Sequence, residues 1–469
     1  MAGLSRQSTR TGRATRRRFL KSTLVAGGAG LSLPDVLRLR AENVNEAASG
    51  DDTAVIQIWL GGGPSQFETF DPKPEAAVEI RGPYDSIATK FPGVRFCETL
   101  PKTAQVVDRA AIIRSVTHST NGHFVAAHWC STGYAGENNV ASRPSAGSIV
   151  SRFHNSAPGG LPQYALLSEE QTRNINIGEV MGAGHLGPRH EPFTVLQDPF
   201  QRAFDNARLQ RSTASLKLAD DVTIERIGDR RALLERIDRL ARNVDSTGVL
   251  DGVDEFNRAA LNMVTSGNAR RAFDITRESQ ATLRLYGSHR WGKMALLARR
   301  LVEAGVKFVT INTAPDSLCW DWHRNIVNDD RPADGSDGPS RGMDVSGPPL
   351  DEMLSALITD LYARGLDKKV LLVVWGEFGR TPKVNKTGGR DHWGSLMSIL
   401  VAGGGLRVGQ VLGASNKNGE IPVERPIAPT DVLATMYRHL GIDTHQHTLT
   451  LQGRPIPILP DGEPIRELI

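Results

Sequence analysis

The stretch Thr53-Ala-Val-Ile-Gln-Ile-Trp-Leu60 runs directly into the turn Gly61-Gly-Gly-Pro-Ser65. Its nearly continuous run of apolar residues predicts a strand that is buried on both faces. The glycines after it allow the backbone to approach a ligand closely. A buried strand ending in such a turn indicates an α/β sheet, in which ligands bind beyond the carboxyl ends of the strands.

The same pattern returns along the chain and predicts the rest of the sheet. An amphipathic helix from Leu350 to Arg364, with Gly365 as its C-cap, separates two apolar strands. Strand, helix and strand in this order predict an α/β fold with a largely parallel central sheet flanked by helices. The further expected elements are strands at Ala111–Val116, Val306–Ile311, Lys369–Trp375 and Ser395–Val401, and a last helix from Pro429 to Leu440.

Two segments depart from this pattern. From about Thr213 to Arg300, apolar residues recur at helical spacing, which predicts a peripheral helical insertion within a domain spanning residues 50–469. The stretch from Asn328 to Pro349 is rich in Gly, Pro, Asp and Ser, and this composition predicts a mobile surface loop.

The N-terminus has the pattern of a targeting segment. Thr15-Arg-Arg-Arg-Phe-Leu-Lys21 precedes the weakly apolar run Leu24–Leu31, which is typical of a twin-arginine export signal. The alternative is a basic, disordered N-terminus. The run is too short to span a bilayer, which takes roughly 20 apolar residues, and no cysteine follows it as a lipid site. Residues 1–45 are therefore expected to be signal and linker, with the export machinery as partner, a periplasmic or extracellular location and no stable membrane anchor.

Charge and cysteine content exclude other classes. The chain has 56 Lys and Arg against 52 Asp and Glu, but residues 1–40 hold nine of the basic residues and one acid. The remainder therefore has a net charge of −4, which gives no support to nucleic-acid binding. Three cysteines are too few for a disulfide scaffold, although one bridge is possible in an oxidising compartment.

Polar residues that could carry chemistry follow four of the expected strands. Because the carboxyl ends of parallel strands meet at one edge, these four groups are expected to converge on one site. In chain order the groups are Ser65, Glu68 and Asp71; His118, Ser119, Thr120, His123 and His128; Asp316, Asp321 and His323; and Glu377, Arg380, Asp391 and His392.

Carboxylates and imidazoles without thiolate clusters favour a divalent metal such as Zn or Mn. Two ions roughly 4 Å apart need about six to eight such ligands, and the four groups supply them. The sharpest signals are the pairs Asp321 with His323 and Asp391 with His392, although either pair could instead be a surface histidine beside a solvated acid.

Other members of the groups carry alternative interpretations. One or two of His118, His123 and His128 are expected as ligands and at least one as a structural histidine. Ser65 is either a nucleophile or the cap of its turn. Glu377 is either a ligand or the ion-pair partner of Arg380, while Arg380 and Arg390 could clamp a phosphate or sulfate oxyanion.

An ordered set of motifs resembles the domain-of-unknown-function 1501 family, whose members carry twin-arginine signals and are similar to the alkaline phosphatase and sulfatase superfamily. The match covers nearly everything after the signal. Its motifs are Gly61–Ser65, Thr69-Phe-Asp-Pro-Lys-Pro74, Trp320-Asp-Trp-His-Arg-Asn325, Gly376-Glu-Phe-Gly-Arg-Thr-Pro382, Gly389-Arg-Asp-His-Trp393, Val401-Ala-Gly-Gly-Gly405, Leu440-Gly-Ile-Asp443 and Gly453-Arg-Pro455.

The resemblance implies an alkaline phosphatase-like fold and a set of metal ligands. Asp321 and His323 would form an Asp-x-His segment, Glu377 would be the acidic ligand at a strand end, and Asp391-His392 would supply the late ligand. Phe378 stands where superfamily relatives often have His. The first strand ends in Leu60 rather than Asp, so Asp71 or Glu68 would substitute there or that metal position is lost. No Cys-x-Pro-x-Arg segment, which matures to formylglycine in sulfatases, is present.

The sequence therefore predicts an exported metal-dependent hydrolase of phosphate or sulfate esters, with a small molecule or glycan ester as substrate and one or two divalent ions as cofactor. The expected nucleophile is Ser119 or Thr120, with Ser65 as the second choice. The expected ligands are Asp321, His323, Glu377, Asp391, His392, His123, His128 and Asp71. The alternative is a catalytically silent exported protein that keeps the fold in order to bind glycans or a partner.

Overall fold

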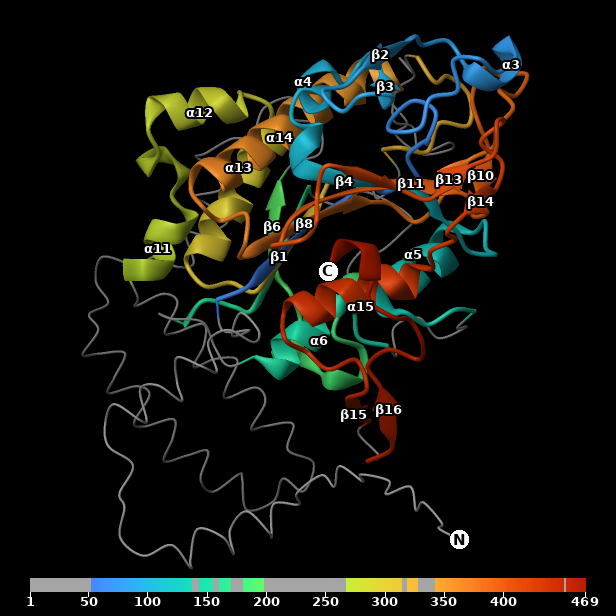
Figure 1. The fold of residues 1–469 in the computed structure, drawn as a ribbon. Coiled ribbons are helices and arrows are strands. Elements are labelled where there is room, and N and C mark those ends of the chain that lie inside the picture. The colour runs from blue at the N-terminus through green and yellow to red at the C-terminus, as the bar shows by residue number, and fades with distance from the viewer. Residues whose placement is uncertain are drawn as a thin grey trace, which may run out of the picture. The chain divides into compact units, whose positions relative to one another are not determined.

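The computed structural model describes residues 52–136, 143–154, 160–169, 180–197, 267–313, 319–327, 342–450 and 453–469 (Figure 1). All of them belong to one compact unit, Gly50–Ile469. The predicted export signal, at residues 1–45, lies outside the described residues, and so does Asp316.

An eight-stranded sheet forms the centre of this unit (Figure 1). Its order is β12-β4-β11-β8-β1-β7-β5-β6, and every adjacent pair is parallel except the two that involve β11. The expectation of a largely parallel sheet is confirmed. The strands are β1 (Ala54–Trp59), β4 (Ala110–Val116), β5 (Tyr164–Glu169), β6 (Phe193–Gln197), β7 (Phe308–Asn312), β8 (Val370–Trp375), β11 (Met397–Gly403) and β12 (Gln410–Leu412).

Strand β1 lies between β7 and β8 in the sheet and pairs with both in parallel. Val55 is paired with Phe308 on one side and Leu371 on the other. Successive side chains of a strand point to opposite faces, so Ile56 and Ile58 enter one hydrophobic core while Val55 enters the other. The continuous apolar run is therefore explained by two covered faces.

Helices cover both faces of the sheet (Figure 1). The core that contains Ile56 also contains side chains of α4, α13 and α14, and the core that contains Val55 contains side chains of α5, α6 and α15. The helices are α3 (Val78–Arg81), α4 (Pro101–Ala104), α5 (His123–Thr132), α6 (Ala146–Phe153), α11 (Gly267–Phe273), α12 (Gln280–Tyr286), α13 (Arg290–Glu303), α14 (Met343–Ala363) and α15 (Pro429–His439).

Short antiparallel pairs and 3-10 turns complete the described elements. The pairs are β2 (Ser86–Ala88) with β3 (Arg95–Cys97), β9 (Gly379–Arg380) with β10 (His392–Trp393), β13 (Ala414–Ser415) with β14 (Pro422–Glu424), and β15 (His447–Leu449) with β16 (Pro455–Pro457). The 3-10 turns are Val107–Arg109, Gly184–Leu186, Pro188–His190, Ile275–Arg277 and Arg466–Leu468.

Helix α14 begins earlier than its sequence pattern predicts. It starts at Met343 and contains Pro348 and Pro349, so the expected surface loop is wrong for its last residues. Met343, Ser346 and Gly347 are buried, and this packing outweighs the hydrogen bonds that the two prolines cannot donate. The earlier part of that expected loop, residues 328–341, lies outside the described residues.

The predicted insertion at about 213–300 lies outside the described residues as far as residue 266. Its described part is helical, in α11, α12 and the beginning of α13. Helix α13 is not peripheral, however, because Met294, Leu297 and Leu301 are buried in the core that covers one face of the sheet. Helical periodicity in the sequence predicts a helix, but it does not show how many other elements pack against that helix.

All three cysteines, Cys97, Cys130 and Cys319, are buried and unpaired, so the possible disulfide is not formed. Within the described part of the chain, no helix combines the length and the apolar composition needed to cross a membrane.

A half-buried histidine makes stability depend on pH. His289 caps α13 by accepting a hydrogen bond at Nδ1 from the Trp291 amide at 3.2 Å. Burial, together with the charge of Arg290, lowers the pKa of His289 from its ordinary 6.5 to about 4. The unfolded chain therefore binds the proton first, so stability at this site is full above pH 6.5 and declines as pH falls toward 4.

We expect His289→Asn to remove part of this decline, because an amide oxygen caps the helix without titrating in this range. Urea unfolding of both proteins at about pH 7, 6 and 5 measures the difference. Equal pH slopes for wild type and variant would contradict the assignment.

Candidate metal centre

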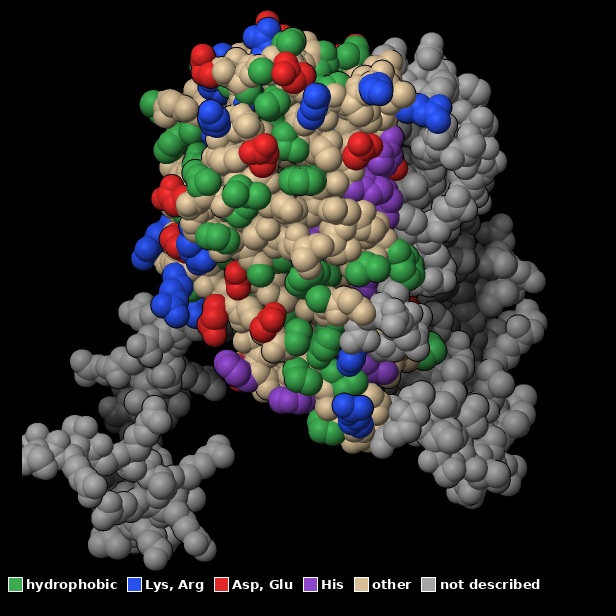
Figure 2. All heavy atoms as spheres, turned by 90° about the vertical axis from the view of Figure 1, so that its right-hand side faces the viewer, with side chains coloured by type: hydrophobic (Ala, Val, Ile, Leu, Met, Phe, Trp, Pro, Cys, Tyr) green, Lys and Arg blue, Asp and Glu red, His purple; other side chains and the backbone are tan. Residues whose placement is uncertain are grey.

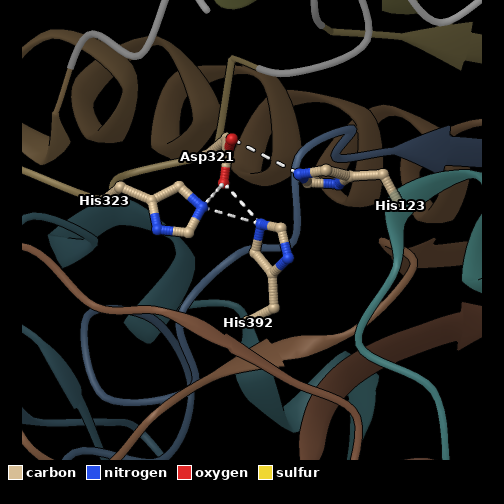
Figure 3. A group of neighbouring side chains, drawn as sticks. All are labelled: His123, Asp321, His323 and His392. Carbon is tan, nitrogen blue, oxygen red and sulfur yellow. Dashed lines mark hydrogen bonds and ion pairs between the residues drawn. The ribbon is translucent and has the colours of Figure 1, made fainter. Parts of the chain in front are cut away.

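Four side chains meet at the edge of the sheet where β1, β7 and β8 end (Figure 3). His123 is the first residue of α5, which follows β4. Asp321 and His323 follow β7, and His392 lies in β10 just before β11. Because β11 is antiparallel to β8, it starts at the edge where β8 ends, and the segment before it reaches the same site.

The four groups, which we call the histidine–aspartate cluster (His123, Asp321, His323 and His392), are crowded. One candidate ligand atom of each lies within 4.8 Å of the others. The Asp321 Oδ1 atom lies 3.1 Å from Nε2 of both His323 and His392, and Oδ2 lies 3.3 Å from Nε2 of His123. The two Nε2 atoms of His323 and His392 are 2.8 Å apart.

Every imidazole of the cluster is held from behind at Nδ1, where a carboxylate or carbonyl oxygen can only accept a hydrogen bond. In the neutral ring this leaves a lone pair on Nε2, directed inward. Histidine ligands of metal ions are held in this way. The acceptors are Asp391 Oδ1 for His323 at 2.9 Å, the Asn121 carbonyl for His392 at 2.8 Å, and Glu377 Oε1 for His123 at 2.8 Å.

When all three rings are neutral, three lone pairs and a carboxylate face one another and repel unless a cation lies between them. The residues present therefore fit a divalent ion, bound by nitrogen and oxygen as Zn or Mn prefers. Glu377 Oε2 adds to this, since it is a buried oxygen with no hydrogen-bond partner among the described residues.

The pKa values of the cluster residues also reflect a need for positive charge beside the Asp321 carboxylate. Burial alone would lower the pKa of His123, but hydrogen bonds to Asp321 and Glu377 raise it to about 9. The hydrogen bond to Asp321 raises the pKa of His323, whereas burial lowers the pKa of His392. Burial opposes ionisation of Asp321, but the Arg380 guanidinium and the three imidazoles hold its pKa far below the ordinary range.

Solvent reaches the cluster from one side. The Asp321 side chain is 8% exposed, while that of His323 is 38% exposed. Asp391, behind His323, is 58% exposed. On one face of the molecule, histidine and acidic side chains lie side by side at the surface (Figure 2). The cluster is therefore partly open to solvent on the side of His323 and Asp391.

The structure brings together six of the eight predicted metal residues. Asp321, His323, His392 and His123 form the cluster. Asp391 and Glu377 border it through hydrogen bonds to imidazoles. The predicted ligand set is therefore divided into residues that face one another and residues that hold them.

His128 and Asp71 lie outside the cluster, which corrects their prediction as ligands. His128 is five residues beyond His123 on α5, about 140° around the helix. Its Nδ1 lies 3.0 Å from the Tyr134 carbonyl. Asp71 is fully buried and pairs with Lys73 at 2.9 Å and Arg114 at 3.3 Å.

Arg380 and Arg390 are not placed to clamp an oxyanion. Arg380 is fully buried, with its guanidinium against Asp321 at 2.5 Å and against backbone carbonyls. Arg390 is buried against Glu68 at 2.8 Å, both side chains being 1% exposed. Neither guanidinium is free to meet a ligand.

The prediction of Ser65 as a nucleophile is also corrected. It is fully buried, and its hydroxyl accepts a hydrogen bond from the Phe67 amide at 3.2 Å, which is the turn-cap alternative. Ser119 is exposed, and the Thr120 hydroxyl accepts from the Gly122 amide at 3.4 Å. Both precede Asn121, the partner of His392, and both remain predictions as nucleophiles.

Three further groups support the cluster, and sequence reasoning anticipated only His118, as one of the histidines that could be structural. The Asn121 carbonyl, which orients His392, leaves no signal in the sequence because any residue has one. His118 donates from Nε2 to the Glu377 carbonyl at 2.6 Å and is structural. The ring of Phe378 packs 4.9 Å from His123 and 4.6 Å from His392, so it forms a wall of the cluster.

Fold and cluster together define an α/β protein with a candidate divalent-metal centre at the carboxyl edge of its sheet. The chain belongs to the family described as "Protein of unknown function (DUF1501)", which matches residues 52–469. No curated protein matches the sequence significantly.

Several solved structures are similar at low TM-score. One is a sulfatase from Pseudoalteromonas sp., with 13% identity, TM-score 0.35, and 87% of this chain and 71% of that chain covered. A phosphonate monoester hydrolase from Silicibacter pomeroyi has 13% identity, TM-score 0.33 and coverages of 89% and 76%. A lipoteichoic acid synthase from Listeria monocytogenes has 10% identity, TM-score 0.35 and coverages of 88% and 76%.

We expect His392→Ala to abolish retention of Zn or Mn after dialysis, because it removes one of the four inward groups. Asp391→Asn should weaken affinity by about 10- to 100-fold, since it alters only the partner that orients His323. Isothermal titration and elemental analysis measure both effects.

His445→Ala is the matched control, because His445 is 86% exposed and pairs with Asp443 away from the cluster. Thermal unfolding of all three variants checks that each is folded. Wild-type metal binding by folded His392→Ala would contradict the assignment of this group.

Proposed function

We propose that this protein is an exported metal-dependent hydrolase of phosphate or sulfate esters. The observation that carries the proposal is the histidine–aspartate cluster, whose three imidazoles present inward nitrogens while their outer nitrogens are fixed. A divalent ion held there would polarise an ester and lower the pKa of a hydroxyl or water nucleophile.

The residues in and around the cluster have different proposed roles. His323 lies on the exposed side, so an ester group would approach past it. Asp391 and Glu377 accept hydrogen bonds from Nδ1 of His323 and His123. In the neutral rings this leaves the inward-facing Nε2 atoms without a proton. Ser119 and Thr120, at the start of the segment that carries Asn121 and His123, are the candidate nucleophiles.

Export is supported by the sequence of the first 40 residues alone. The paired arginines at Arg16 and Arg17, followed by Phe19-Leu20-Lys21 and a short apolar run, match the twin-arginine pattern. That route carries proteins already folded, which suits a centre assembled from segments far apart in the chain. The proposed location is periplasmic or extracellular.

The chain without its signal, loaded with Zn or Mn, is expected to hydrolyse 4-nitrophenyl phosphate or 4-nitrophenyl sulfate. Chelation by EDTA should lower kcat/KM at least about 100-fold, with recovery on adding the ion back. Release of 4-nitrophenol is the measurement, with His392→Ala as inactive variant and His445→Ala as active control.

A metal-loaded wild type that cleaves neither ester would count against hydrolysis. If such a protein instead retained a sulfated glycan in a metal-dependent manner, the silent binding protein would replace the hydrolase.

Replacing Arg16 and Arg17 together by Lys should leave folded precursor in the cytoplasm, because the pathway recognises the arginine pair. Fractionation with antibody detection, before and after the change, measures this. Normal amounts of the doubly substituted protein outside the cytoplasmic membrane would show that the pair is not an export signal.

A further inference from the structure

A buried positive charge is built into the cluster. The Nη2 atom of Arg380 lies 2.5 Å from Oδ1 of Asp321, the same oxygen that faces His323 and His392. The Arg380 side chain is completely buried, and that of Asp321 is 8% exposed. The charge therefore acts on Asp321 with little screening by solvent.

The guanidinium is held in place from several directions. Its Nε donates to the Gly63 carbonyl at 2.8 Å and its Nη1 to the Arg390 carbonyl at 3.1 Å. Its Nη2 also donates to the carbonyls of Trp320 and Gly62. Three of these carbonyls come from the glycine turn after β1 and from the segment that carries Asp321, so Arg380 cannot swing away.

The other acids near this edge are held by hydrogen bonds or ion pairs, although Glu377 Oε2 has no hydrogen-bond partner among the described residues. Glu68 pairs with Arg390, and Asp71 pairs with Lys73 and Arg114. Asp391 is bonded to His323, and Glu377 gives one oxygen to His123. Among the described residues, the histidine–aspartate cluster is the one group of three or more His, Cys, Asp or Glu side chains that lie close enough together to hold a metal ion.

We propose that this centre holds one divalent ion, and that Arg380 supplies, as a fixed side chain, the positive charge that a second ion would bring. Arg380 is then a positioning residue that acts through Asp321. A second divalent ion on Asp321 would lie within a few ångströms of both the first ion and the guanidinium, and like charges at such distances repel strongly. This inference rests on the proposed metal centre and adds its stoichiometry.

Elemental analysis of the wild-type chain, saturated with Zn or Mn and freed of excess ion, tests the number directly. We expect one ion per chain. Two ions per chain overturn this inference while leaving the proposed hydrolase standing. No bound ion overturns the metal centre itself, so the two failures are distinguishable.

Two variants test the charge of Arg380. In Arg380→Met the repulsion between guanidinium and ion is gone, so the affinity for the ion should rise at least about tenfold. Arg380→Lys keeps the charge and should stay near the wild-type affinity. Isothermal titration with Zn measures both, and thermal unfolding without metal reports whether each variant folds.

If Arg380 had only a structural role, the two variants would give a different result. Both variants would then lose affinity, because neither Met nor Lys can hold the carbonyls that the guanidinium binds. Loss of affinity in both folded variants therefore overturns the electrostatic role. If Arg380→Met does not fold, the wild-type stoichiometry and Arg380→Lys still decide the question.

Discussion

The rest of this structure depends on a local balance of charge around the Asp321 carboxylate. Asp321 is nearly buried, and such a group is costly unless positive charge or hydrogen-bond donors surround it. Arg380 meets one of its oxygens, and three imidazoles take up the remaining space. Each imidazole is in turn fixed at its outer nitrogen, so the cluster keeps its shape through partners in different segments of the chain.

The sheet brings those segments together. β1, β7 and β8 are parallel neighbours, so the glycine turn, the Asp321 segment and Glu377 all begin at one edge. Because β11 is antiparallel to β8, the segment that carries His392 reaches this edge before β11 begins. At Gly63, whose φ is +85°, a Cβ atom would clash with the Phe378 ring, so glycine lets the turn after β1 pack beside the wall of the cluster.

Contacts with imidazoles distinguish the acids of the cluster from the structural acids. Glu68 and Asp71, which follow β1 in the chain, pair with Arg390, Lys73 and Arg114. Such pairs hold loops in register, because removing one partner leaves an uncompensated buried charge. Asp321, Asp391 and Glu377 contact imidazoles, Asp321 in addition to its ion pair with Arg380, and imidazole nitrogens are also metal ligands.

The sequence by itself determined the central strands and the segments that carry Asp321, His323 and His392, because continuous apolar runs and residues just after them are local patterns. The tertiary structure decided which similar residues join the cluster. His123 and His128 look alike in the sequence, but helix geometry turns only His123 inward. The sequence suggested Arg380 as a ligand clamp, whereas the fold buries it against Asp321, and the Asn121 carbonyl had no signal at all. Partners separated by tens to hundreds of residues are chosen by how strands and helices pack, and no local pattern contains that choice.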